Sequence, residues 1–209
     1  TGKLGDIIHS KPVYRKETEA HKGNIVYVGA NDGMLHAFSA EDKDDIKGGD
    51  EVFAYIPNLV FEKLPLLAGL NYTHNYFVDA EPYIKKITSG SHSDKTFLVG
   101  GLGKGGKGYY GLDVSDPYNF DENHVLWEYP KPPYEGTCQM INASGDITIT
   151  NGYPCSKDAD MGFSFSKAFI VKSNIGYSPG NASDSSSDQW VVIFGNGYDS
   201  TNGKAALYV

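Results

Sequence analysis

The chain has 209 residues, of which 25 are glycine and 10 are proline. Both residues weaken helices, so this content excludes a helical bundle. The 15 tyrosines and 10 phenylalanines favour strands, because aromatic side chains suit a pleated, half-buried surface. A formal net charge of −8 argues against a protein that holds nucleic acid by neutralising its phosphates. The apolar runs are only a few residues long, which excludes an apolar helix that crosses a membrane.

A first β-hairpin is predicted over residues 24–38, where the triplet Asn31-Asp32-Gly33 joins two short apolar runs. Asn, Asp and Gly tolerate the backbone angles of a tight turn, so this is a strong local signal for paired strands. A further strand is predicted over residues 51–56. Residues 58–70 hint at a helix, which Pro65 is expected to interrupt because proline lacks the backbone donor.

The pattern of strand, glycine-containing turn and strand returns twice. The second hairpin combines residues 96–100 with 109–114 and is followed by a strand over residues 125–129. The third combines residues 190–194 with 204–209. In each hairpin the second strand has a similar sequence, as expected for a repeated structural unit.

Repeated hairpins of this kind are typical of a β-propeller, in which each small sheet buries its faces against its neighbours. The spacing between the hairpins is irregular, and long insertions cover residues 58–75, 130–160 and 178–188. We therefore predict an all-β fold, a partial or modified β-propeller with long loop insertions. Residues 1–209 are expected to be part of one such domain, truncated at both ends.

The only two cysteines, Cys138 and Cys155, flank a polar stretch that reads as a loop or a hairpin. A disulfide between them would stabilise the fold by roughly 3 kcal/mol through the loop that it closes. Such a bond would indicate an exported protein, because reducing compartments disfavour disulfides. Two unpaired buried thiols are the alternative.

Several patterns resemble catalytic or binding motifs without their context. Residues 101–108 match G-x-G-x-x-G and nearly match a phosphate-binding loop, but a strand pattern follows where those motifs need a helix. The acidic residues 41–51 contain enough oxygens for calcium but not the order of a calcium loop, so a solvated hairpin tip is favoured. His36 lies in an apolar strand and is expected to be a hydrogen-bonded core residue. The sequence thus predicts no catalytic, cofactor-binding or metal-binding residue.

Three segments together resemble one known family: LGDIIHSKPV over residues 4–13, VYVGANDGMLHAF over residues 26–38 and EVFAYIP over residues 51–57. Residues 191–198 and 203–209 are similar to a later part of the same domain. The resemblance is to the C-terminal propeller of the PilY/PilC type IV pilus tip adhesins and biogenesis factors. It covers nearly the whole chain, with a weaker middle third.

This resemblance implies a modified β-propeller related to quinoprotein dehydrogenases, with quinoprotein-like blades. It also implies a non-enzymatic module that supports type IV pilus assembly, adhesion and twitching motility in a Gram-negative bacterium. The expected location is the pilus tip, the cell surface or the periplasm, and the expected partners are pilin subunits, minor pilins or a host-surface receptor. Family members often carry a calcium loop in this domain, but none occurs here, so calcium is expected only in the intact domain, beyond Val209.

Two other functions are weighed against this hypothesis. A periplasmic quinoprotein dehydrogenase would share the strand pattern around residues 33–38, but it would need a central quinone, calcium and usually adjacent cysteines, which Cys138 and Cys155 are not. A carbohydrate-binding propeller would explain the tyrosine-rich loops.

Overall fold

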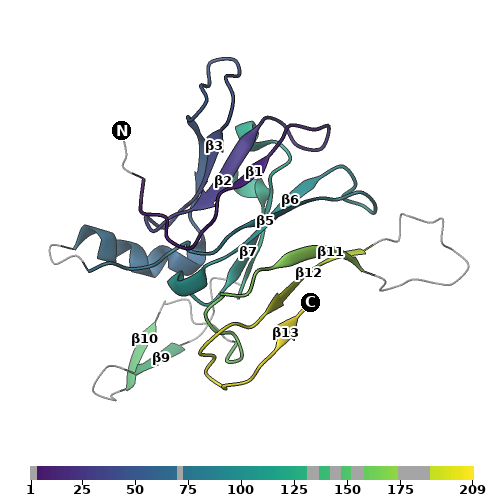
Figure 1. Cartoon of the computed structure of the whole chain (residues 1–209). Coiled ribbons are helices and arrows are strands. Elements are labelled where there is room, and N and C mark those ends of the chain that lie inside the picture. The colour runs from purple at the N-terminus through teal and green to yellow at the C-terminus, as the bar shows by residue number, and fades with distance from the viewer. Residues whose placement is uncertain (1–3, 70–72, 131–136, 142–146, 152–157, 174–188) are drawn as a thin grey trace, which may run out of the picture.

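The structure is a computed structural model that describes residues 4–69, 73–130, 137–141, 147–151, 158–173 and 189–209. Within these ranges the strands form three antiparallel meander sheets and one separate two-stranded hairpin (Figure 1). In each meander, strands that follow one another along the chain also pair with one another. The predicted all-β class is therefore confirmed.

The first sheet contains β1 (Val13–Arg15), β2 (Ile25–Gly29), β3 (Leu35–Ser39) and β4 (Glu51–Tyr55) in that spatial order. The predicted first hairpin is confirmed as β2 and β3, with Gly29 opposite Leu35 next to the turn. Across the sheet, Tyr27 pairs with Ala37 and Ala37 with Phe53. Because residues directly opposite one another point to the same face, these three side chains form one row.

The second sheet contains β5 (Tyr83–Lys86), β6 (Thr96–Gly101), β7 (Tyr109–Asp113) and β8 (Val125–Tyr129). The hairpin and following strand that the sequence predicts here are confirmed. Three short 3₁₀ segments lie in the connections: η2 (Gly103–Gly105), η3 (Pro117–Asn119) and η4 (Glu122–His124). This sheet repeats the strand order of the first.

The third sheet contains β11 (Phe169–Ser173), β12 (Gln189–Gly195) and β13 (Leu207–Tyr208). The third predicted hairpin forms, but its second strand is shorter than the predicted 204–209. The reason is the Asn196 side chain, whose Nδ2 donates to the Lys204 carbonyl at 2.7 Å and whose Oδ1 accepts from the Ala206 amide at 3.0 Å. These bonds replace the strand ladder just before Leu207.

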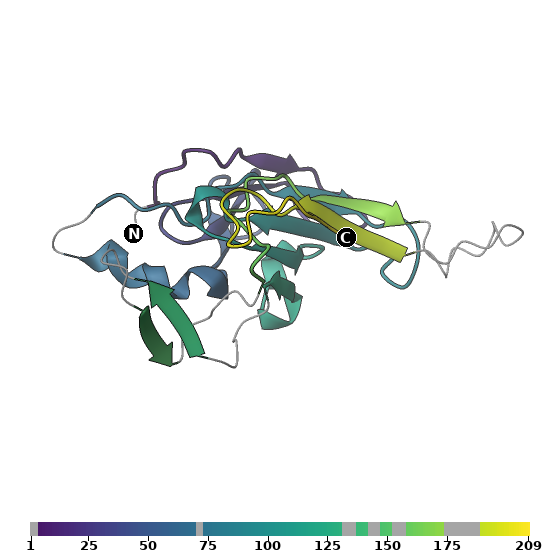
Figure 2. The same cartoon turned by 90° about the horizontal axis from the view of Figure 1, so that it is seen from below.

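The strands β9 (Thr137–Ile141) and β10 (Ile147–Asn151) form a hairpin in the connection between the second and third sheets. Figures 1 and 2 show that it stands apart from the three meander sheets. The hairpin alternative for this polar stretch is thus confirmed. The Cys138 backbone lies in β9, opposite Thr150, whereas Cys155 lies outside the described residues, so the disulfide stays a prediction.

The predicted helix forms as the 3₁₀ segment η1 (Asn58–Ala68). The expectation that Pro65 interrupts it is wrong, because the segment continues through Pro65. Its Lys63 points inward, where Nζ donates to the carbonyls of Tyr76 at 2.8 Å and Gly105 at 2.7 Å. Burial lowers the pKa of this amine. The two carbonyl oxygens accept from two of its three N–H donors, and they fix η1 against the segment before β5 and against η2, which follows β6.

Apolar side chains are buried between neighbouring sheets. One core joins the first and second sheets through Tyr27, Leu35, Leu98, Tyr110 and Leu112, among others. A second core joins the second and third sheets and includes Val99, Tyr109, Ile170 and Phe194. The first strands of the three meander sheets are also neighbours: β1 lies near β5, and β5 lies near β11.

The glycine-rich segment at residues 101–108 is a tight connection between β6 and β7 rather than the start of a helix. A Cβ on Gly105 would lie 1.6 Å from the Phe77 carbonyl oxygen, so only glycine allows this approach. Gly103 adopts φ +58°, in the left-handed region that glycine enters at little cost. The segment is thus shaped for packing, and the prediction of a hairpin turn is confirmed.

Replacing Leu98 by alanine tests the first core. Its side chain is 1% exposed, so Leu98→Ala should lower the free energy of unfolding by about 3 kcal/mol through lost burial and a cavity. Leu126→Ala is the matched control in the same sheet, because Leu126 is 42% exposed and its truncation should cost below about 1 kcal/mol. Urea denaturation measures both values, and equal losses would contradict this description of the core.

Candidate functional site

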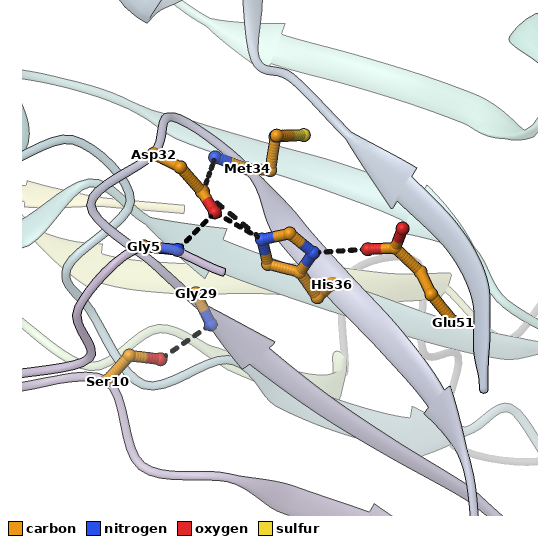
Figure 3. A network of polar contacts seen from close by, with 7 residues as sticks. All are labelled: Gly5, Ser10, Gly29, Asp32, Met34, His36 and Glu51. Carbon is orange, nitrogen blue, oxygen red and sulfur yellow. Dashed lines mark hydrogen bonds and ion pairs between the residues drawn. The ribbon is translucent and has the colours of Figure 1, made fainter. Parts of the chain in front are cut away.

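The N-terminal strap, residues 4–10, crosses the turn of the β2–β3 hairpin (Figure 3). The Gly5 amide donates to Asp32 Oδ2 at 2.7 Å, and Ser10 Oγ accepts from the Gly29 amide at 2.8 Å. Asp32 also accepts from the Met34 amide at 3.1 Å, which holds the turn itself. One carboxylate thus organises both the turn and the strap.

His36 lies on β3 between two carboxylates, as Figure 3 shows. Its Nε2 lies 3.1 Å from each oxygen of Asp32, and its Nδ1 lies 2.5 Å from Glu51 Oε1. The side chain is only 4% exposed. Because a carboxylate can only accept, both ring nitrogens donate when the imidazole is protonated, and the charged form fits this environment best.

Burial opposes charge on His36, but hydrogen bonds to Asp32 and Glu51 outweigh this effect and raise its pKa above the usual 6.5. Burial likewise opposes charge on Asp32, yet hydrogen bonds from His36 and the Gly5 amide lower the pKa of that carboxyl below 3.8. The two pKa shifts share one cause: His36 and Asp32 form an ion pair, in which each side chain favours the charged form of the other.

Asn31 links the strap to the segment that precedes β5. Its Nδ2 donates to Asp6 Oδ2 at 3.1 Å, and its Oδ1 accepts from the Phe77 amide at 3.0 Å. The same Asp6 oxygen lies 2.8 Å from His74 Nε2. Hydrogen bonds to His74 and Asn31 outweigh the opposing effect of burial and lower the pKa of Asp6.

A second histidine pair closes the other end of the strap. His9 Nδ1 lies 2.6 Å from Asp79 Oδ2, and the His9 amide donates to Asp79 Oδ1 at 3.2 Å. The Asp79 side chain is 1% exposed, and His9 stacks on Tyr76 with ring centroids 5.8 Å apart. A carboxylate this deeply buried requires such partners, since an unpaired buried charge is very costly.

These contacts form one polar brace, which we define as Asp6, His9, Asn31, Asp32, His36, Glu51, His74 and Asp79. It joins the segments that carry the family resemblance, residues 4–13, 26–38 and 51–57. The prediction that His36 is a hydrogen-bonded core residue is confirmed. The pairs His9–Asp79 and His74–Asp6 were not predicted, because their partners lie 70 and 68 residues apart.

The brace is suited to hold segments together rather than to transform a substrate. Both ring nitrogens of His36 already contact carboxylates, and its side chain is buried. Among the described residues, no group of three or more His, Cys, Asp or Glu side chains is arranged to hold a metal ion. The side chains of the brace thus act by ion pairing and hydrogen bonding, which hold the connected segments together.

The acidic loop between β3 and β4 does not fit a calcium site, because its carboxylates bind the chain instead of converging. Asp42 Oδ1 accepts from the Gly48 amide at 2.9 Å, and Asp50 Oδ2 accepts from the Lys47 amide at 2.8 Å. Glu41 Oε1 accepts from the Asn24 amide at 3.0 Å. The prediction of a solvated tip is confirmed, and calcium stays a prediction for the intact domain.

Comparison with known proteins gives a consistent result. The family described as the PilY1 beta-propeller domain matches residues 4–209. The type IV pilus biogenesis factor PilY1 of Pseudomonas aeruginosa strain UCBPP-PA14 is 36% identical over 98% of the chain, which is 16% of that protein. A PilY1 homolog of Xylella fastidiosa is 38% identical over 88% of the chain, which is 10% of that protein. The chain thus spans a small part of the relatives it matches.

A solved structure agrees with these sequences. The crystal structure of the Pseudomonas aeruginosa PilY1 C-terminal domain covers 89% of the chain with a TM-score of 0.53 and 31% identity, and the chain covers 27% of it. The predicted propeller-type fold is therefore confirmed. The three meander sheets are consecutive blades, and those described here do not close into a ring. No helix among the described residues is long and apolar enough to cross a membrane.

The ion pair of His36 predicts a defined pH dependence. Because the folded pKa of His36 is raised, its contribution is full below pH 6.5 and is lost as the pH rises through the folded pKa. The contribution of Asp32 is present above pH 3.8 and is lost as the pH falls through its lowered folded pKa. His36→Gln should therefore lower the free energy of unfolding by about 2 kcal/mol at mildly acidic pH, and by less at alkaline pH.

Urea denaturation at several pH values measures this difference. The control is His124→Gln, which removes a histidine that is 25% exposed and paired with the exposed Asp121, and it should cost at most about 1 kcal/mol. A His36→Gln effect that is constant across the pH range would show that the imidazolium does not stabilise the brace.

Proposed function

Because the chain belongs to the PilY1 β-propeller domain family, we propose that it is a non-enzymatic module of a type IV pilus biogenesis factor. The observation that carries this proposal is the family match over residues 4–209. The relatives are named pilus biogenesis factors. The brace is consistent with a structural module, since its buried imidazole is already bonded on both sides.

The module supports pilus assembly and, through assembled pili, adhesion and twitching motility. Its partners are pilin subunits or minor pilins at the pilus tip, with a host-surface receptor as a further partner. It acts after export, at the pilus tip, the cell surface or in the periplasm. The ordered sheets around the first core supply a rigid scaffold on which exposed loops are presented.

Removal of the module from its gene tests the proposal directly. An in-frame deletion of the codons for residues 4–209 should abolish surface pili and twitching, and the intact gene should restore both. Electron microscopy of sheared pili and the diameter of twitching zones are the measurements. Complementation with Lys85→Gln, which changes an exposed side chain on β5, should restore both phenotypes as well as the intact gene. Normal piliation in the deletion strain would contradict the proposal.

The non-enzymatic part of the proposal has its own test. The purified protein, supplied with calcium and a quinone cofactor, should show no dye-linked oxidation of primary or secondary alcohols above a buffer control. Saturable, protein-dependent dye reduction would instead identify a quinoprotein dehydrogenase and would overturn the non-enzymatic assignment.

A further inference from the structure

The connection between β12 and β13 contains two Asn-Gly pairs, Asn196-Gly197 and Asn202-Gly203. Asparagine followed by glycine is prone to deamidation, because glycine has no side chain that would hinder attack of its backbone nitrogen on the asparagine side chain. The two pairs share one connection and the same solvent. A difference in their reactivity must therefore come from the local structure around each pair.

The first pair is held in place by packing. Asn196 is 4% exposed, and its side chain makes three hydrogen bonds to backbone groups, at 2.6, 2.7 and 3.0 Å. A Cβ on Gly197 would lie 1.8 Å from the Phe163 carbonyl oxygen, so the backbone here is closely packed as well. The Asn196 amide group and the nitrogen that would attack it can approach each other only after these contacts open.

The second pair lies in an open part of the same connection. Asn202 and Gly203 are both exposed, and a Cβ on Gly203 would meet nothing within 4 Å. Asn202 Nδ2 donates to Asp160 Oδ1 at 2.8 Å. The Asn202 amide donates to the Ala159 carbonyl and the Gly203 amide to the Ser200 carbonyl, each at 3.0 Å. These contacts lie at the surface, where brief local opening costs little free energy.

We propose that Asn202 is a deamidation site of the folded protein and that Asn196 is protected. The Gly203 backbone nitrogen loses its proton to solvent and bonds to Cγ of Asn202. The Nδ2 group leaves as ammonia, and a succinimide ring remains. Water then opens the ring at either carbonyl group, which yields aspartate or isoaspartate at this position. The reaction consumes water, releases ammonia and requires no oxidant or reductant.

The modification reverses the character of one contact. In the amide form, Asn202 donates to Asp160, which lies in the segment before β11. In the aspartate form, two carboxylates meet at this place. Neither can donate, and their like charges repel. Deamidation thus adds negative charge at an exposed tip and weakens the link between the β12–β13 connection and the segment before β11.

Tandem mass spectrometry of the purified protein, aged at mildly alkaline pH, tests the proposal. In the folded protein Asn202 should convert at least about tenfold faster than Asn196, because Asn196 reacts only through opened forms of the connection. Ageing in concentrated urea is the control, and there the two residues should convert at similar rates, since glycine follows both. Conversion of Asn196 as fast as Asn202 in the folded protein, or conversion of Asn202 in urea alone, would overturn the proposal.

Exchanging the two side chains tests the effect on the contact. Asn202→Asp represents one product and should lower Tm by about 3 °C, because a donor is replaced by a repelling carboxylate. Adding Asp160→Asn gives the contact one amide and one carboxylate again, in reversed order, and should return Tm to within about 1 °C of the original value. A double variant no more stable than Asn202→Asp alone would contradict the assigned role of Asp160.

Discussion

The face-to-face burial of apolar rows between neighbouring sheets is the constraint on which the rest of this structure depends. A meander of three or four short strands has two faces, and it cannot cover either of them with its own residues. The row Tyr27–Ala37–Phe53 becomes core only because Tyr110 and Leu112 of the next sheet, and Phe120 from the connection between β7 and β8, lie against it. Strand order, glycine placement and the position of the aromatic residues all follow from this requirement.

The polar brace depends on that packing and reinforces it. Its carboxylates and imidazoles sit where the first hairpin turn meets the segment before β5, at the rim of the first core. Buried polar groups of this kind are tolerated only when hydrogen-bonded, and the strap supplies the His9 amide and imidazole that contact the buried Asp79 side chain. In turn, the strap ties the chain before β1 to the segment that leads into β5, the first strand of the second sheet. The segment at residues 4–13, which carries no recognisable catalytic motif, thus contributes to the fold by connecting the first hairpin turn to the segment before β5.

Features that depend on residues close together in the sequence could be predicted, whereas features that depend on contacts between distant segments could not. The Asn31-Asp32-Gly33 turn and the strands around it could be predicted, because turn chemistry and alternation act over a few residues. The first strands, such as β1 (Val13–Arg15), could not, because they are short and are held by pairing with the next strand. The shortening of β13 depends on a side chain, Asn196, that competes with the backbone ladder.

The same difference between local and long-range signals applies to the polar brace. The sequence predicted that His36 forms hydrogen bonds, since a histidine in an apolar strand needs partners. It did not predict that Glu51 is one of them, since Glu51 lies on another strand. The pair of His9 and Asp79 is set by how two sheets dock, which no local pattern records. The glycine-rich connection before β7 could be separated from a phosphate loop because a strand pattern follows it.

The meander order of the sheets also has a consequence for how the chain acquires its structure. Within each described sheet, every strand after the first pairs with the strand made just before it, so each sheet needs only short loop closures, which are fast and cost little entropy. We expect a chain emerging from the ribosome or from a translocation pore to complete its sheets in sequence. The slow events are then the docking steps between completed sheets, rather than a search for strand partners far away in the chain.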